Sequence, residues 1–127
     1  MKAVRAILLA MLLILGSGTA PARGAHGSIV VNEQTKGLVK AKPGEAVEIR
    51  LRSQPGTGFS WVSTNYALKL TPLPPIERQA IPGGWQTQRF RFVAKRAGTY
   101  RLTFSYDQPW KGGAKGARTA TFRIKVR

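Results

Sequence analysis

The run Thr99-Tyr100-Arg101-Leu102-Thr103-Phe104-Ser105-Tyr106 decides the fold class. Its large apolar side chains stand at every second position, and the residues between them are polar or charged. A period of two places one set on the core face of a β-strand and the other set in solvent. The run is therefore predicted to be a half-buried strand.

The same alternation continues on both sides of this run. It predicts further strands at Glu45–Arg52, Gln86–Ala94 and Arg118–Val126, and weaker candidates are Ser28–Asn32, Gly37–Lys40, Trp61–Ser63, Leu68–Thr71 and Ile76–Gln79. Gly- and Pro-rich turns, such as Thr71-Pro72 to Pro75, separate these segments at short intervals, and no segment after residue 22 has a convincing helical period. About seven short antiparallel strands in roughly 100 residues are typical of an all-β, immunoglobulin-like β-sandwich.

The first 22 residues are interpreted as an export signal, and residues 23–127 as one domain. Lys2 and Arg5 precede an uninterrupted apolar run, Ala6–Leu15, and small residues follow, with cleavage expected between residues 20 and 25. An apolar run of this length does not cross a bilayer, which needs about 20 residues. We therefore expect a monomeric, exported domain, periplasmic or secreted, that is not held in the membrane after cleavage.

Few residues of the chain could carry chemistry. There is no cysteine, and the one histidine, His26, stands beside the expected cleavage site. Neither a Cys–His pair nor a triad with histidine can form within the domain. The acidic residues are scattered, and Glu48 is predicted to lie on the solvent face of its strand in a solvated ion pair with Arg50. The sequence thus predicts a protein that is not an enzyme and needs no metal or other cofactor.

The charge balance is strongly basic. With 21 Lys and Arg residues against five Asp and Glu residues, the formal net charge is +16, and it is +14 without the two basic residues of the signal. Such a field attracts acidic surfaces, so binding of nucleic acid or of an acidic polymer is an alternative function. The outward arginines come from strands that a sandwich divides between two opposite faces, which favours general attraction over a single polyanion groove.

Three connections are expected to meet at one end of the sandwich. Alternate connections lie at the same end when strands run up and down, which groups a first loop (Gln54–Phe59), a second loop (Ala80–Trp85) and a third loop (Asp107–Ala117). Clustered loops on a rigid scaffold are typical of a binding site.

The aromatic residues near these loops fall into two groups. Trp61 begins a predicted strand, and the alternation puts Phe59 on the same side, so both are expected to pack toward the core. Trp85 and Trp110 stand at Gly- and Pro-rich turns. There, each could fold back over the end of the core or serve as a contact anchor.

These loops resemble those of the chagasin-type inhibitors of papain-like cysteine peptidases, the I42 inhibitor family. That family's first loop reads approximately Asn-Pro-Thr-Thr-Gly-Tyr/Phe-x-Trp, and this chain has Gln54-Pro55-Gly56-Thr57-Gly58-Phe59-Ser60-Trp61. The family's second loop is Gly-rich before an alternating strand, as Gly83-Gly84-Trp85 is here. Its third loop carries Arg-Pro-Trp after a strand that ends in an aromatic residue, and Tyr106 here leads to Gln108-Pro109-Trp110.

The resemblance implies a domain whose three loops wedge into the active-site cleft of a papain-like cysteine peptidase and occlude it reversibly. The residues that it assigns to peptidase binding are Pro55, Gly56, Thr57, Gly58, Phe59, Gly83, Gly84, Trp85, Gln108, Pro109 and Trp110.

Three positions depart from the family pattern: Gln54 replaces Asn, Gln108 replaces Arg, and Gly56 replaces the Thr expected nearest the target's catalytic cysteine. A domain of the same fold that has lost inhibition is therefore a further alternative.

Overall fold

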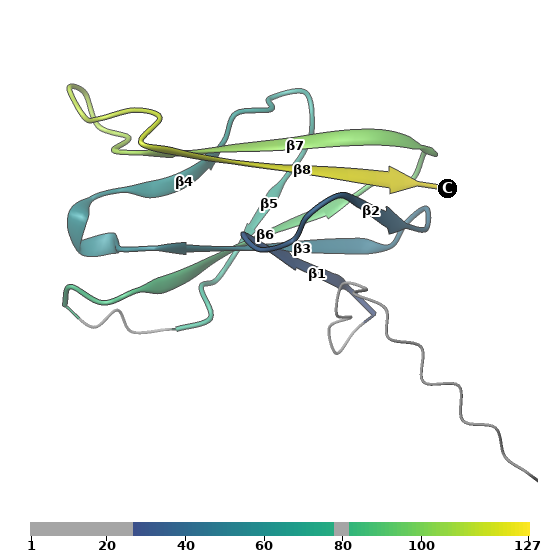
Figure 1. Cartoon of the computed structure of the whole chain (residues 1–127), viewed down its shortest axis with the longest axis horizontal. Helices are drawn as coiled ribbons and strands as arrows, with labels where there is room; N and C mark the ends of the chain where they lie inside the picture. Colours follow the sequence, from purple (N-terminus) through teal and green to yellow (C-terminus); the bar gives the residue numbers. More distant parts are fainter. Residues whose placement is uncertain (1–26, 78–81) are drawn as a thin grey trace, which may run out of the picture.

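The computed structural model describes residues 27–77 and 82–127; the expected export signal, His26 and residues 78–81 lie outside the described residues. In the described part, eight strands form two four-stranded sheets packed face to face (Figure 1). The strand order is β1-β3-β6-β5 in the first sheet and β2-β8-β7-β4 in the second. The prediction of an all-β, immunoglobulin-like sandwich is confirmed.

The bounds of the strands follow the alternating runs. The first sheet contains β1 (Ile29–Asn32), β3 (Ala46–Ser53), β5 (Thr71–Leu73) and β6 (Gln86–Val93). The second contains β2 (Leu38–Ala41), β4 (Ser60–Ser63), β7 (Gly98–Asp107) and β8 (Arg118–Val126). A 3-10 turn, η1 (Pro55–Thr57), connects β3 to β4. Within the described ranges, no helix is long and apolar enough to cross a membrane.

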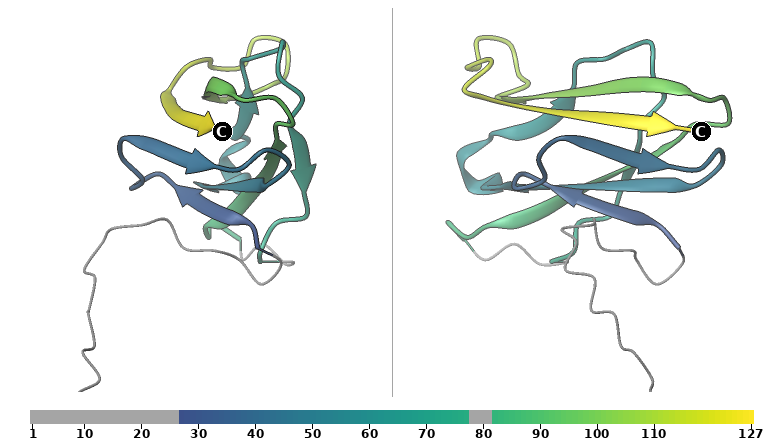
Figure 2. Two further views of the ribbon diagram at one scale, coloured as in Figure 1. Left: turned by 90° about the vertical axis from the view of Figure 1, so that its right-hand side faces the viewer. Right: turned by 45° about the vertical axis from the view of Figure 1, so that its right-hand side comes forward.

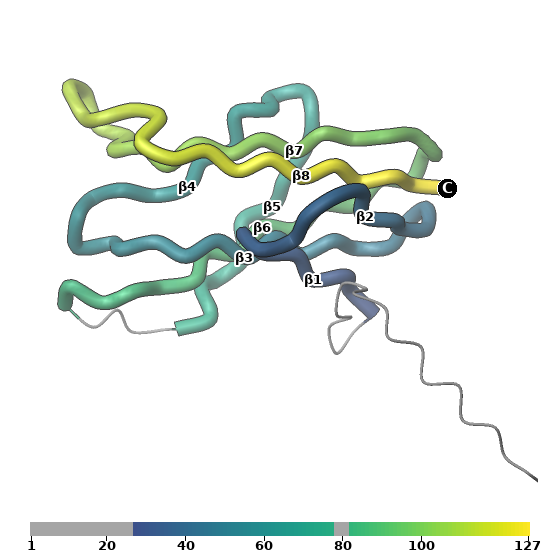
Figure 3. The backbone as a smooth tube through the Cα atoms, viewed as in Figure 1, coloured from purple at the N-terminus to yellow at the C-terminus, as the bar shows by residue number. Residues whose placement is uncertain are grey.

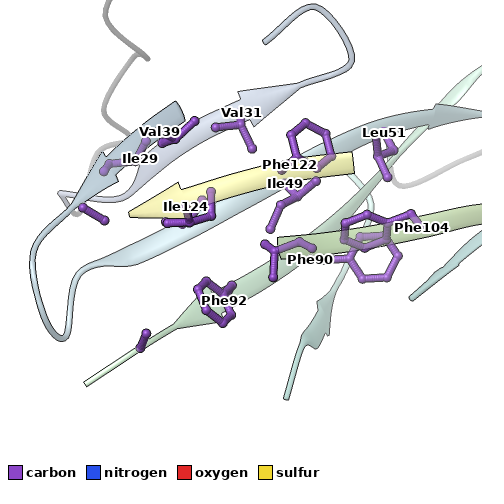
Figure 4. Packing of buried hydrophobic residues seen from close by; sticks show 14 of the residues in the cluster. Ile29, Val31, Val39, Ile49, Leu51, Phe90, Phe92, Phe104, Phe122 and Ile124 are labelled. Carbon is purple, nitrogen blue, oxygen red and sulfur yellow. The ribbon is translucent and has the colours of Figure 1, made fainter. Parts of the chain in front are cut away.

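Inward side chains of both sheets form one hydrophobic core (Figure 4). Ile49 of β3, Leu102 of β7 and Ile124 of β8 are completely buried. The ring of Phe104 joins the layers, since its centroid lies 5.0 Å from that of Phe90 in the first sheet and 6.0 Å from that of Phe122 beside it. The alternation seen in the sequence is therefore the alternation between core and solvent.

The two N-terminal strands pair in parallel, which corrects the expectation of antiparallel strands throughout. β1 runs alongside β3 with Ile29 opposite Val47, and β2 runs alongside β8 with Leu38 opposite Arg123. The chain thus passes from the edge of one sheet to the edge of the other between β1 and β2 (Figure 2). The central pairs, β3 with β6 and β7 with β8, are antiparallel as predicted.

The prediction of a strand at Ile76–Gln79 is wrong for its two described residues, because Ile76 and Glu77 form a bend. The strand that pairs with β6 on this side is β5, which lies earlier in the chain and includes Pro72. β5 is at the edge of its sheet, where the missing N–H of proline need not interrupt the ladder. Thr71 and Pro72, which the sequence indicated as a turn, are therefore part of a strand.

Glu48 is buried, at 8% exposure, and so is not the solvated residue expected from the sequence. Its carboxylate accepts hydrogen bonds from Arg50 Nε and Arg89 Nη2, both at 2.5 Å. Burial alone would raise the pKa of Glu48, but the hydrogen bonds from Arg89 and Arg50, with the attraction of their charges, outweigh it and hold the pKa below its usual value. The cluster joins β3 to β6 on the outer face of the first sheet.

Candidate functional site

The three loops meet at one end of the sandwich, as predicted. They lie at the end away from the C-terminus, on the left in Figures 1 and 3. The first loop contacts both of the others: Gln54 Nε2 donates to the carbonyl of Gly83 at 3.5 Å, and Gln108 Nε2 donates to the carbonyl of Thr57 at 3.0 Å. The first loop therefore contacts the third loop and residues 82–85, which are the described part of the second loop.

The first loop is a 3-10 turn held by its own hydrogen bonds. Pro55 stands at the start of the turn, and Gly58 closes it in the left-handed conformation at φ 78°. Thr57 Oγ1 donates to the carbonyl of Gln54 at 2.6 Å and accepts the Phe59 N–H at 3.3 Å. The Gln54 N–H donates to the hydroxyl of Tyr106 at 2.9 Å, which fixes the loop to β7.

Trp110 lies over Gly58. A Cβ on Gly58 would overlap the Trp110 ring, so a side chain here would force that ring to move and would also strain the left-handed backbone. The Trp110 residue is nevertheless 51% exposed. Trp110 therefore combines the two roles considered from the sequence: one part of the ring covers the first loop, and the rest is available to a partner.

The third loop is braced at its base by Asp107 and Gln108. Asp107 Oδ1 accepts the Gly116 N–H at 2.5 Å and the Ser105 hydroxyl at 2.6 Å, and these bonds, that from Gly116 foremost, lower the pKa of Asp107. Gln108 Oε1 accepts the Ala114 N–H at 3.0 Å, while its amide nitrogen reaches the first loop. One side chain thus holds the third loop closed and ties it to the first.

The other aromatic residues divide as the sequence suggested. Trp61 is buried, at 3% exposure, and its Nε1 donates to the carbonyl of Arg52 at 2.9 Å. Phe59 is half-buried and stacks on Tyr106, with ring centroids 5.2 Å apart. Trp85 is exposed, and the Arg52 guanidinium lies 5.4 Å from its ring centroid. Trp85 and Trp110 are therefore the two tryptophans that a partner could contact.

All eleven residues predicted to bind a peptidase are described, and all lie in these three loops. Sequence reasoning missed the connections between the loops, above all those made by Gln54 and Gln108. Gln54 is predicted only to depart from the family pattern, and Gln108 is predicted to contact the peptidase and not to connect two loops. No motif or period indicates their contacts, because the contacts depend on how separate loops pack against one another.

The site presents amides, hydroxyls, glycines and exposed indoles, with the Asp107 carboxylate at the base of the third loop. In residues 27–77 and 82–127, no group of His, Cys, Asp or Glu is arranged to hold a metal ion. The described residues of the three loops form a surface connected by hydrogen bonds. The fold and this end of it define a β-sandwich that presents loops for binding.

Comparison with known proteins gives the family. Residues 40–126 match the family described as Chagasin family peptidase inhibitor I42, and the chain belongs to that family. Chagasin from Trypanosoma cruzi is 30% identical over 93 residues, which cover 65% of this chain and 83% of chagasin.

Solved structures share the fold. The cysteine protease inhibitor EhICP2 from Entamoeba histolytica has a TM-score of 0.62 at 19% identity, with 79% of this chain and 95% of EhICP2 covered. Amebosin has a TM-score of 0.57 at 25% identity, over 77% of this chain and 94% of amebosin. PbICP-C, solved in complex with falcipain-2, has a TM-score of 0.55 at 21% identity, over 79% of this chain and 98% of its own.

Proposed function

We propose that this protein reversibly inhibits papain-like cysteine peptidases by occluding the active-site cleft with its three loops. Membership in the chagasin family supports inhibition as the function. The names of the structural relatives support the class of target, since EhICP2 is a cysteine protease inhibitor and PbICP-C was solved with falcipain-2.

The observation that carries the proposal is the connection of the first loop to both of its neighbours. Gln54 bonds to the second loop, Gln108 bonds to the first from the third, and Trp110 covers Gly58. Loops that are ordered before binding lose little conformational entropy on binding, so more of the contact energy appears as affinity. This arrangement suits a rigid wedge better than a flexible substrate-like segment.

The chemistry of the wedge explains how it would enter a cleft without being cleaved. Cleavage requires the nucleophile to reach a peptide carbonyl carbon from one face of the planar peptide group. Here the backbone of residues 55–57 is coiled in a 3-10 turn, and the Thr57 Oγ1 bond to Gln54 opposes its opening. Gly56 is exposed and has no side chain, so its backbone can approach the cleft closely.

The exposed indoles provide the anchors on either side of this turn. Trp85 belongs to the second loop and Trp110 to the third, and both keep about half of their surface exposed. Large aromatic side chains of this kind often dominate the energy of an interface. The interface would be of standard size, about 800 Å² on each partner.

The experiment is a titration of the mature domain against papain and a cathepsin L-type peptidase, with a serine peptidase as the control. We expect inhibition of the cysteine peptidases only, recovery of activity on dilution, and intact inhibitor afterwards. A sample shown to be folded that leaves both cysteine peptidases active at micromolar concentrations would instead support a non-inhibitory member of the family.

The interpretation of residues 1–22 as an export signal places the encounter with a peptidase in the periplasm or outside the cell. N-terminal sequencing of the protein from its natural host checks this part of the proposal. We expect the mature chain to begin between residues 21 and 26, and retention of Met1 would contradict it.

A further inference from the structure

One half of strand β8 has an open edge. β8 pairs with β7 from Arg118 to Val126 along one side, whereas β2 covers only Arg123–Val126 on the other. In the part of the chain that the structure describes, no strand pairs with the outer edge of residues 118–122. An open edge presents backbone N–H and C=O groups to which a further strand can bond.

A hollow of about 700 Å³ lies along this edge. One wall is β8 itself, another is the turn between β1 and β2, which includes Lys36 and Gly37, and Trp61 lies among its lining residues. The exposed side chains of β8 at the opening, Thr119 and Thr121, are short, and a Cβ on Gly37 would have no contact within 4 Å beyond its chain neighbours. The hollow therefore has room for a backbone beside β8.

The charges around the hollow are predominantly positive. Lys36, Arg101, Arg118 and Arg123 line it, against the single acid Glu33. Glu33 is already engaged, because it accepts the Arg52 N–H at 2.8 Å and lies 3.7 Å from Arg118 Nη2. A second copy of this chain would bring the same positive charges to the edge and be repelled, whereas an acidic segment would be attracted.

The two sides of an added strand would meet different surroundings. Residues facing outward would lie near Arg101 and Arg123, on the solvent face of the second sheet. Residues facing inward would lie near Phe122 and Trp61, which are buried and border the hollow, and near the Arg118 guanidinium, which lies 5.4 Å from the Trp61 ring centroid. Because side chains alternate along a strand, the site suits a sequence in which acidic and apolar residues alternate.

We propose that the edge of β8 at residues 118–122 binds an extended acidic peptide segment of a partner protein by strand addition. The backbone bonds supply affinity for any extended chain, and the arginines select acidic residues. This surface lies outside the three loops, so it goes beyond peptidase inhibition and does not depend on it.

The test uses the peptide acetyl-Thr-Glu-Val-Glu-Val-Glu-Thr-amide and the mature domain, with NMR amide shifts and calorimetry as readouts. We expect the largest shifts at residues 118–122. Only alternate N–H groups of an added strand face the edge of β8. The critical comparison therefore uses two N-methylated peptides of identical charge, one methylated at an N–H that faces the edge and one at an N–H that faces away. The first should bind at least tenfold more weakly than the unmethylated peptide, and the second should bind about as well as the unmethylated peptide.

Variants of the protein test the charge. Arg123→Glu should weaken binding of the acidic peptide about threefold or more, while Arg96→Glu, in the turn before β7, is the matched control and should change it little. A peptide with Lys in place of Glu should not bind. Equal binding of both N-methylated peptides, equal binding of single-stranded DNA at the same edge, or self-association through this edge would each overturn the proposal.

Discussion

Gly56 and Gly58 stand two positions apart in the first loop but meet different constraints. A Cβ on Gly56 would make only ordinary contact, 3.6 Å from the Gly83 nitrogen, and its backbone is not in the left-handed region. Gly58 has φ 78° and lies under Trp110. We expect Gly56→Ala to raise the free energy of unfolding by about 0.5 kcal/mol, because it restricts the unfolded chain. Gly58→Ala should lower it by about 1–2 kcal/mol or more.

Urea unfolding of the two variants measures these free energies, and peptidase inhibition by the same samples measures the effect on the loop. Gly58→Ala should weaken inhibition at least tenfold, since the Trp110 ring must move. Equal behaviour of the two variants would show that Trp110 does not hold the first loop.

Gln108 tests whether the loops act as one unit. Gln108→Met keeps the size of the side chain but removes both the bond to Thr57 and the bond from Ala114. We expect inhibition to weaken about tenfold, a loss of about 1.4 kcal/mol, because the two loops must then be ordered on binding. Stability should change by less than about 1 kcal/mol, because both partners are reachable by water.

Gln108→Glu separates the two bonds. The carboxylate can still accept the Ala114 N–H, so hydrogen exchange at Ala114 should match the wild type, but it cannot donate to the Thr57 carbonyl. Inhibition should fall nearly as far as in Gln108→Met. Full inhibition by both variants would mean that the tie between the loops contributes nothing to binding.

For single residues, the sequence predicted those features that depend on the local sequence pattern. The burial of Trp61 follows from its place in an alternating strand, and the turn at Pro55–Gly58 follows from proline and glycine. The burial of Glu48 could not be predicted, because Arg89, which covers it, lies 41 positions away. The bridging roles of Gln54 and Gln108 were missed for the same reason.

Strands β3 and β6 are held together by the Glu48 cluster in addition to their ladder. Glu48→Gln keeps the size of the residue but leaves Arg50 and Arg89 without their counter-charge. At pH 7 we expect it to lower the free energy of unfolding by about 1–2 kcal/mol. Lys125→Gln, on the outer face of the second sheet, is the control and should change it by less than about 0.5 kcal/mol.

The pH dependence of this effect has a definite sign. The folded pKa of Glu48 lies below its ordinary value of 4.5, so its contribution is present above pH 4.5 and is lost as the pH falls through the folded value. The difference between wild type and Glu48→Gln should therefore shrink in acid. Urea unfolding at several pH values between neutral and strongly acidic measures it. A difference independent of pH would contradict a charged role for Glu48.

The predicted strands were correct where a strand has its own alternation and wrong where its partner determines it. β6, β7 and β8 each carry a long period-two run and were found within one or two residues. β5 has three residues, one of them Pro72, and exists because β6 offers an edge for pairing. Strand β1 pairs in parallel with β3, and β2 pairs in parallel with β8. No local sequence pattern indicates which sheet edge each of these two strands joins.

The charge of the whole molecule bears on the two functions proposed from the sequence. Both sheets carry arginines on their outer faces, for example Arg91 on the first and Arg101 and Arg123 on the second. The residues predicted to enter the cleft are, by contrast, all uncharged. Charge should therefore affect how often the protein meets an acidic peptidase more than how firmly it is held.

Salt separates inhibition from polyanion binding. Between about 0.05 and 0.5 M NaCl, the association rate with an acidic peptidase should fall about tenfold, while the dissociation rate should change less than about twofold, because exposed charges are screened and buried neutral contacts are not. Binding to single-stranded DNA should fall by about a thousandfold over the same range if several phosphates are neutralised. Surface plasmon resonance measures both on one sample. A dissociation rate from the peptidase that rises as steeply as that from DNA would mean that the basic faces, and not the three loops, hold the complex together.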